Sequence, residues 1–198
     1  MAPEIFQHPE INAVPRTALD DLCLDFINSR FHDHRGTGVV YDRLLLAGWW
    51  SWLVERWDLG PCPPPGGVQL AELRRLRSRV RRLVEAGEPP SARDRHALDR
   101  ILSGAPVIWQ FSGEPGSAEL LLRAVSTGVR HVAASIVVSV VEVLSGDGSR
   151  VRRCANPHCS FLFRDTSRSG SRRWCDPAIC GNLVKVRAFR AVHRSGVR

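Results

Sequence analysis

Four cysteines near the C-terminal end of the sequence have the spacing of a metal site. They form two Cys-x4-Cys pairs, Cys154/Cys159 and Cys175/Cys180, joined by a polar, arginine-rich connection. A proline inside each pair favours a turn, which lets the two sulfurs of the pair approach a single ion. Soft thiolate ligands satisfy Zn²⁺ without help from carboxylates. The pattern therefore predicts a zinc site at these four cysteines.

The same residues indicate what the zinc would do. Because four thiolates fill every position around a tetrahedral ion, no position is left for water, and we expect a structural ion rather than a catalytic one. His158, which lies inside the first pair, is an alternative fourth ligand. Two disulfides are a further alternative, which a reducing cytoplasm disfavours.

We expect the chain to lie in the cytoplasm, with no membrane partner. Its first sixteen residues have neither the basic start nor the apolar centre of a secretory signal. No apolar run approaches the roughly 20 residues that span a bilayer. A length of 198 residues with 43% apolar content suits one medium domain plus a small one.

Positive charge is concentrated around the cysteines. The chain has a net charge of +8, yet from Arg150 onward twelve Lys or Arg oppose two Asp, whereas residues 1–149 carry sixteen basic and eighteen acidic side chains. Four thiolates and one Zn²⁺ contribute a charge of about −2, so the metallated segment stays strongly basic. A compact basic module on a nearly neutral body predicts a polyanionic partner.

A basic helix is predicted directly after the last cysteine. At about 3.6 residues per turn, one stripe of this helix contains Leu183, Arg187, Arg190 and Arg194, while Lys185 projects elsewhere. Guanidinium groups at that spacing can meet phosphates along a groove, or the base edges of guanine, which favours double-stranded DNA as the partner. An arginine-rich helix that faces only solvent is the alternative.

Helices and one hairpin are predicted upstream of this basic segment, where apolar residues recur at helical or alternating spacing. The helices are expected at 18–29, 42–57, 69–86, 91–104 and 127–144, and the hairpin strands at 107–111 and 118–125. Gly146 to Gly148 predicts a boundary between a domain of residues 1–148 and a domain of residues 149–198, with the second docked on the first.

Within the second domain, residues 161–163 and 172–174 are expected to pair as a short hairpin around a turn at 166–171. We therefore expect an α+β fold. A mainly helical N-terminal domain with a short β-hairpin would be followed by a small treble-clef-like zinc finger, whose metal replaces most of a hydrophobic core.

Two other groups of residues could do chemistry. Four of the six tryptophans lie at 42–57 and could line a ligand pocket, although such clusters more often form core. His32 and His34 could bind a metal, although their glycine-rich context favours a solvated turn. No nucleophile and base at an informative spacing, no phosphate loop and no paired-carboxylate signature is present, so we do not expect an enzyme.

Two resemblances follow from these motifs. Residues 152–194 resemble the CGNR-type zinc finger, with Trp174-Cys175, Cys180-Gly181-Asn182 and Lys185-Val186-Arg187 at the family's positions, and with Leu183 in place of the family's arginine. Upstream, Leu22-Cys23-Leu24-Asp25-Phe26-Ile27-Asn28, the tryptophan-rich helix and the helix that begins after Pro89-Pro90 resemble the ABATE domain of stress-induced bacterial transcription regulators.

The resemblances imply a DNA-binding transcription regulator from a bacterium, with an α+β N-terminal domain. Our first hypothesis is that this domain binds a small-molecule effector or forms a homodimer. The resemblances also imply that the four cysteines are zinc ligands and that Asn182, Lys185 and Arg187 contact DNA, with Arg190 and Arg194 continuing the basic stripe. Leu183 also leaves a second hypothesis open. In it, the finger is a protein-interaction or dimerisation module in which this leucine is an apolar contact.

Overall fold

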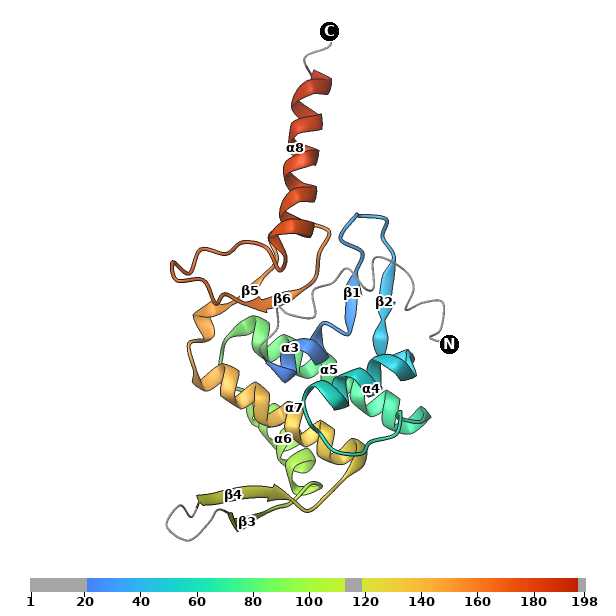
Figure 1. Ribbon diagram of the computed structural model, residues 1–198, viewed down its shortest axis with the longest axis vertical. Helices are drawn as coiled ribbons and strands as arrows, with labels where there is room; N and C mark the ends of the chain where they lie inside the picture. The colour runs from blue at the N-terminus through green and yellow to red at the C-terminus, as the bar shows by residue number, and fades with distance from the viewer. Residues whose placement is uncertain (1–20, 113–118, 196–198) are drawn as a thin grey trace.

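The computed structural model of the chain describes residues 21–112 and 119–195. Helices form most of this part of the chain (Figure 1), with bounds α3 (Leu22–Ile27), α4 (Ala47–Arg56), α5 (Gly67–Ala86), α6 (Ala92–Ser103), α7 (Gly128–Ser145) and α8 (Asn182–Ser195). Three short helical turns are η1 (Arg43–Leu45), η2 (Gly148–Arg150) and η3 (Pro177–Gly181). The α+β fold expected from the sequence is confirmed.

In the described ranges, the strands form three separate antiparallel pairs. These are β1 (Arg30–His32) with β2 (Val40–Asp42), β3 (Val107–Ser112) with β4 (Glu119–Ala124), and β5 (Val151–Arg153) with β6 (Leu162–Arg164). The β3–β4 pair is the predicted hairpin, with Val107 opposite Ala124. Its predicted turn at 112–116 lies largely outside the described residues. The pair lies at the opposite end of the molecule from α8 (Figure 1).

The helix boundaries follow local sequence signals. In α5, the residues Leu73, Leu76, Val80, Leu83 and Val84 repeat at helical spacing and are all buried. Gly87 ends this helix with a φ of 65°, a left-handed conformation that favours glycine. Ser91 begins α6, because its hydroxyl oxygen accepts a hydrogen bond of 3.2 Å from the backbone N–H of Asp94.

The predicted helix at 127–144 is confirmed as α7. Its 18 residues have a mean hydropathy of 1.5, so by length and composition alone this helix could cross a membrane. Core helices pass the same test. Here one face, which includes Val132, Ile136, Val140 and Val143, is buried against α3, α5 and α6. The apolar character of α7 therefore has a structural explanation in the core.

Two of the four tryptophans at 42–57 lie in the core, which favours the packing interpretation over a ligand pocket for these two. In α4, Trp49 is 3% exposed and Trp50 is completely buried, together with Leu53. The indole N–H of Trp50 donates to the carbonyl of Cys62 at 3.3 Å, which satisfies the polar end of the ring. Every residue of α3 is also buried, and its apolar side chains belong to the same core cluster as those of α4.

The hairpin predicted within the zinc-finger segment is wrong in its pairing. Residues 162–164 form β6 as expected, but their partner is β5, with Arg152 opposite Phe163. Residues 172–174 form no strand, and a single backbone hydrogen bond of 2.9 Å joins Ala155 N–H to Arg173. The reason is the turn between Cys154 and Cys159, which folds β5 back onto β6 before the second cysteine pair is reached.

The zinc-finger segment is docked on the helical body, as predicted. Asn28, which follows α3, donates from Nδ2 to the carbonyl of Leu162 at 2.8 Å and accepts from the N–H of Leu162 at 3.0 Å. Arg164 forms two hydrogen bonds with the carboxylate of Asp21, at 2.7 and 2.8 Å. In contrast, α8 projects away from the rest of the molecule (Figure 1).

Candidate metal centre

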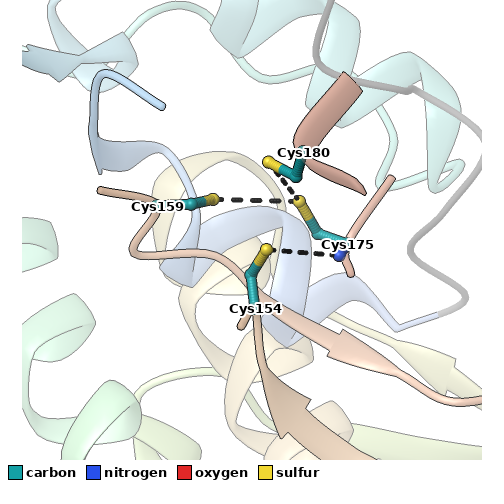
Figure 2. A group of neighbouring side chains, drawn as sticks. All are labelled: Cys154, Cys159, Cys175 and Cys180. Atoms are coloured by element: carbon teal, nitrogen blue, oxygen red, sulfur yellow. Dashed lines mark hydrogen bonds between the residues drawn. The ribbon is translucent and has the colours of Figure 1, made fainter. Parts of the chain in front are cut away.

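The four cysteines of the two Cys-x4-Cys pairs meet at one point (Figure 2). Their sulfurs all lie within 4.8 Å of one another. The Cys159–Cys175 separation is 3.8 Å, and the Cys175–Cys180 separation is 3.6 Å. A tetrahedral ion with Zn–S bonds of about 2.3 Å requires sulfurs about 3.8 Å apart. The donor set therefore fits Zn²⁺ in type, number and spacing.

The environment of the sulfurs suits a closed structural site. Each cysteine is 2–5% exposed, so water has little access to an ion among them. Hydrogen bonding with Cys159 lowers the pKa of Cys154, whereas hydrogen bonding with Cys154 raises the pKa of Cys159 and of Cys175. The four sulfurs are thus coupled to one another. Because thiols must lose their protons to bind a divalent cation, the affinity of the site for that cation should increase with pH.

Local backbone hydrogen bonds place the sulfurs. Cys154 N–H donates to the carbonyl of Phe161 at 2.9 Å, which closes the first pair at the end of β5. In the second pair, the carboxylate of Asp176 accepts from the N–H groups of Ala178 and Ile179, at 2.6 and 3.0 Å. This cap begins the turn η3, which carries Cys180 and leads directly into α8. The metal site thus fixes where the basic helix begins.

Comparison with known families gives the same two parts of the chain. The sequence profile of the ABATE family, described as "Putative stress-induced transcription regulator", matches residues 20–147. The chain belongs to the ABATE family. The profile of the CGNR zinc finger matches residues 150–193, which include all four clustered cysteines. The two descriptions are those of a regulator and of a zinc finger, and the four clustered cysteines are the ligands of a structural Zn²⁺. A search of curated proteins gave no match.

Asn156 is a residue of the CGNR finger that the sequence reasoning missed. It is completely buried inside the first cysteine pair. Its Nδ2 donates to the carbonyl of His34 at 3.0 Å and lies 3.6 Å from the sulfur of Cys180, while its Oδ1 accepts from His158 N–H at 3.2 Å. The amide of Asn156 therefore contacts both a ligand sulfur and the backbone of the ABATE region. It connects the metal site to the body. An asparagine before proline in a cysteine turn was the available signal.

Gly181, in the motif Cys180-Gly181-Asn182 after which the finger is named, has a packing role. A Cβ atom added to Gly181 would lie 3.0 Å from Cδ1 of Trp174 and 3.3 Å from its Nε1. The indole ring therefore lies directly against the backbone where α8 begins. This contact explains why a tryptophan before the third cysteine is combined with a glycine after the fourth.

The loop that holds the two histidines packs partly on the CGNR finger, so its interpretation as a solvated turn holds for His32 and residues 35–40 but not for Asp33 and His34. Asp33 is 2% exposed and His34 is 6% exposed. The carboxylate of Asp33 accepts from the N–H groups of Arg35 and Thr37, both at 2.9 Å. At Gly36, with a φ of 79°, an added Cβ would lie 2.8 Å from the ring of His158. Contacts from the distant finger, such as the hydrogen bond from Asn156 to the carbonyl of His34, thus cover part of this loop, while residues 35–40 stay exposed.

The histidines do not join the metal site. Among the residues that the structure describes, the group of potential metal ligands consists of the four cysteines alone. The ring of His158, the alternative fourth ligand, lies against Gly36 rather than among the sulfurs. The geometry therefore favours four thiolates over a site with three thiolates and one imidazole.

The predicted DNA contacts on α8 have different environments. Asn182, Lys185 and Arg190 are exposed. Arg187 is partly buried, and its Nη2 donates to the carbonyl of Arg35 in the loop after β1. Its Nη1 is buried and has no hydrogen-bond partner among the described residues. The side chain of Arg194 lies outside the part of the chain that is described. Leu183, in place of the family's arginine, is half-buried.

Proposed function

We propose that this protein is a zinc-dependent, DNA-binding transcription regulator of bacterial cytoplasm that acts in a stress response. The observation that carries this proposal is the position of α8. The helix begins at the four-cysteine cluster, carries exposed basic side chains and projects away from the body (Figure 1). In the proposal, residues 149–198 bind double-stranded DNA, and residues 1–148 bind an effector or a second copy of the chain.

The charges of α8 support contacts with DNA phosphates. The helix contains four basic residues, Lys185, Arg187, Arg190 and Arg194, and no acidic residue. We assign phosphate contacts to Lys185, Arg190 and Arg194, and a contact near the start of the helix to Asn182. Arg187 also belongs to this surface, but its hydrogen bond to Arg35 indicates that it additionally fixes the direction of α8 relative to the body.

A cavity in the body supports the effector half of the proposal. About 560 Å³ in volume, it lies between α3, the end of α6 and α7, and apolar side chains such as Leu22, Leu102 and Val138 line most of it. This volume is within the range of roughly 300–1,000 Å³ typical of small-molecule sites. Asp21 also lines the cavity and is the carboxylate that binds Arg164 of the finger. A ligand that moved Asp21 would therefore act on the finger directly.

Selection of DNA by zinc-loaded, full-length protein tests the proposal. We expect one sequence to be enriched, and the enriched site then allows a salt titration. Replacing Lys185 and Arg190 with alanine should lower the slope of log affinity against log salt by about 2, because each phosphate contact contributes about 0.9. The matched control replaces Arg75 and Arg93, exposed arginines on α5 and α6, and should leave the slope unchanged.

Two outcomes would contradict DNA binding through α8. One is selection without enrichment, with no measurable binding of duplex DNA at low salt. The other is an equal change of slope in the α8 variant and in the control variant. Zinc content must be equal in all proteins compared, and a Cys175→Ser variant should lose both zinc and DNA binding.

Exposed apolar side chains on α8 favour a second candidate function, a zinc-stabilised protein-interaction or dimerisation module. Phe189 is 63% exposed and Val192 is 70% exposed. They lie beside Lys185 on the helix rather than on the stripe of Leu183. Light scattering of wild type and of a Phe189→Ser/Val192→Ser variant distinguishes the candidates. A dimer that this variant abolishes, together with unchanged DNA affinity, would favour the interaction module.

A further inference from the structure

A small basic cavity lies where the body meets the finger, away from α8. It has a volume of about 230 Å³ and lies between α5, β1 and β5. Four arginines contribute to its wall. Arg30 comes from β1, Arg77 and Arg81 come from α5, and Arg153 comes from β5 of the finger. Glu85 is the one acidic residue of the wall, so both parts of the chain supply positive charge to one concave surface.

Two of these arginines are already neutralised by carboxylates. Arg77, which is 4% exposed, forms hydrogen bonds of 2.7 and 2.9 Å with Asp42. The guanidinium of Arg81 lies 3.3 Å from Glu85 and also donates to the carbonyl of Ser160. These pairs fix the positions of both side chains. The uncompensated positive charge of the cavity therefore comes from the other two arginines, Arg30 and Arg153.

Arg30 and Arg153 have no such partners among the described residues. Within residues 21–112 and 119–195, no carboxylate forms an ion pair with either guanidinium, and both residues are exposed at the mouth of the cavity. Their charges act on Arg81, since burial and the charges of Arg153 and Arg30 lower the pKa of Arg81 against the opposing effect of Glu85. The cavity thus holds like charges close together and has a surplus of two.

We propose that this cavity is a binding site for a phosphate-type oxyanion, which Arg30 and Arg153 hold from two sides. Planar guanidinium groups match the tetrahedral oxygens of phosphate with paired hydrogen bonds. The volume of 230 Å³ is below the usual range of drug-sized sites, so it accommodates a phosphate group while the rest of a larger molecule stays outside.

A bound oxyanion would connect the two parts of the chain. Arg30 belongs to the region matched by the ABATE family, and Arg153 belongs to the CGNR finger. Without an anion, these charges repel across the junction; with one, they share a ligand. The site therefore favours the docked arrangement of finger and body. It stands on its own lining residues and does not depend on contacts between α8 and DNA.

The phosphate could come from a small phosphorylated molecule or from the DNA backbone. The experiment uses zinc-loaded, full-length protein and inorganic phosphate as the probe, with calorimetric titration as the measurement. We expect saturable binding of one phosphate per chain, and at least tenfold weaker binding in an Arg30→Gln/Arg153→Gln variant. The matched control, Arg75→Gln/Arg93→Gln, removes the same charge from exposed positions outside the cavity and should bind phosphate like wild type.

Three outcomes decide the proposal and the source. If the Arg30→Gln/Arg153→Gln variant loses phosphate binding but keeps its affinity for DNA, the ligand is a small phosphorylated molecule. Loss of phosphate binding together with a DNA salt slope lowered by about 2 indicates a backbone phosphate. Phosphate binding that does not saturate, or that is equal in both double variants, overturns the site. An Arg30→Lys/Arg153→Lys variant keeps the charge without the planar fork, and we expect its affinity to lie between those of wild type and the glutamine variant.

Discussion

Asp25 places a carboxylate where its charge is unfavourable. The residue is 6% exposed; Trp57 Nε1 donates to its carboxylate at 2.9 Å, and Arg56 lies 3.5 Å away. Burial raises the pKa of Asp25 to about 6, although the hydrogen bond from Trp57 and the charge of Arg56 act in the opposite direction. The pKa of this side chain in the unfolded chain is about 3.9. At pH values between about 3.9 and 6, Asp25 therefore binds more protons in the folded protein than in the unfolded chain. The stability of the protein falls as pH rises through that window.

We predict that Asp25→Asn stabilises the protein at neutral pH. A carboxylate with a pKa near 6 is charged at pH 7.5, at a cost of up to about 3 kcal/mol, which the neutral amide avoids. The difference in unfolding free energy between variant and wild type should shrink as pH falls toward 5, because the wild-type carboxylate then becomes neutral. Urea unfolding in zinc-containing buffer at several pH values measures this difference.

The control for this prediction is Asp147→Asn. Asp147 is exposed, and a hydrogen bond from Ser149 lowers its pKa, so it stays ionised throughout the range from pH 5 to 7.5. Any change in stability that this control variant causes should be the same at every pH. If the difference caused by Asp25→Asn is equally independent of pH, the burial of a charged carboxylate is not its cause.

The burial of Asp25 could not be read from the sequence. In the helix predicted at 18–29, Leu22, Cys23 and Phe26 recur at helical spacing, and all three are buried. This spacing leaves Asp25 on another face of the helix, where a carboxylate is expected to reach solvent, whereas every residue of α3 is buried. The partners that make burial of the acid possible, Arg56 and Trp57, lie about thirty residues away. Only the assembled fold brings them together.

At the scale of elements, Asn28 explains why the motif of α3 ends in an asparagine. Its amide donates to and accepts from the backbone of Leu162, as a neighbouring strand would, and the residue is 1% exposed. It extends the edge of the β5–β6 pair without adding a strand. One side chain therefore joins elements that are 134 residues apart in the sequence.

We predict that Asn28→Ala destabilises the junction between body and finger. The substitution leaves the buried N–H and carbonyl of Leu162 without partners, and each unsatisfied group costs about 1–3 kcal/mol. Global unfolding by urea should show a loss of at least about 2 kcal/mol. Hydrogen exchange at β6 should become faster than exchange in α6. Asn182→Ala, at an exposed site, is the matched control, and an equal loss in both variants would argue against the pairing.

Local signals account for the elements that the sequence predicted well. The five upstream helices and the β3–β4 hairpin each have their own periodicity and their own turn or cap, and the spacing of the cysteines identified the metal site. The helix predicted at 42–57 begins only at Ala47, because Asp42 belongs to β2 and residues 43–45 form η1. The pairing of β5 with β6 was missed because the apolar residues 161–163 can pair in either direction along the chain. The metal-centred turn, rather than strand propensity, decides the direction. The docking of the loop at Asp33 was missed for a similar reason, since its partners lie in the finger.

At the scale of the whole molecule, finger and body share one hydrophobic core. Phe161, Leu162 and Phe163 are at most 4% exposed and belong to the same buried cluster as Phe26 and Phe31 of the body. The rings of Phe31 and Phe161 meet edge to face at 5.4 Å. Zinc therefore holds not only the finger but also one wall of the common core. Two independently stable units would not share their apolar side chains in this way.

This shared core predicts how the protein responds to loss of zinc. Calorimetry of the zinc-loaded protein should show a single unfolding transition, and chelation should move the entire transition to lower temperature. If zinc contributes even about 5 kcal/mol to stability, the Tm of a chain of this length falls by roughly 10–20 °C. Cys175→Ser should behave like the chelated protein, whereas Cys62→Ser, at a cysteine outside the cluster, should behave like wild type. A body transition that keeps its Tm after chelation, while a separate finger transition disappears, would contradict a common core.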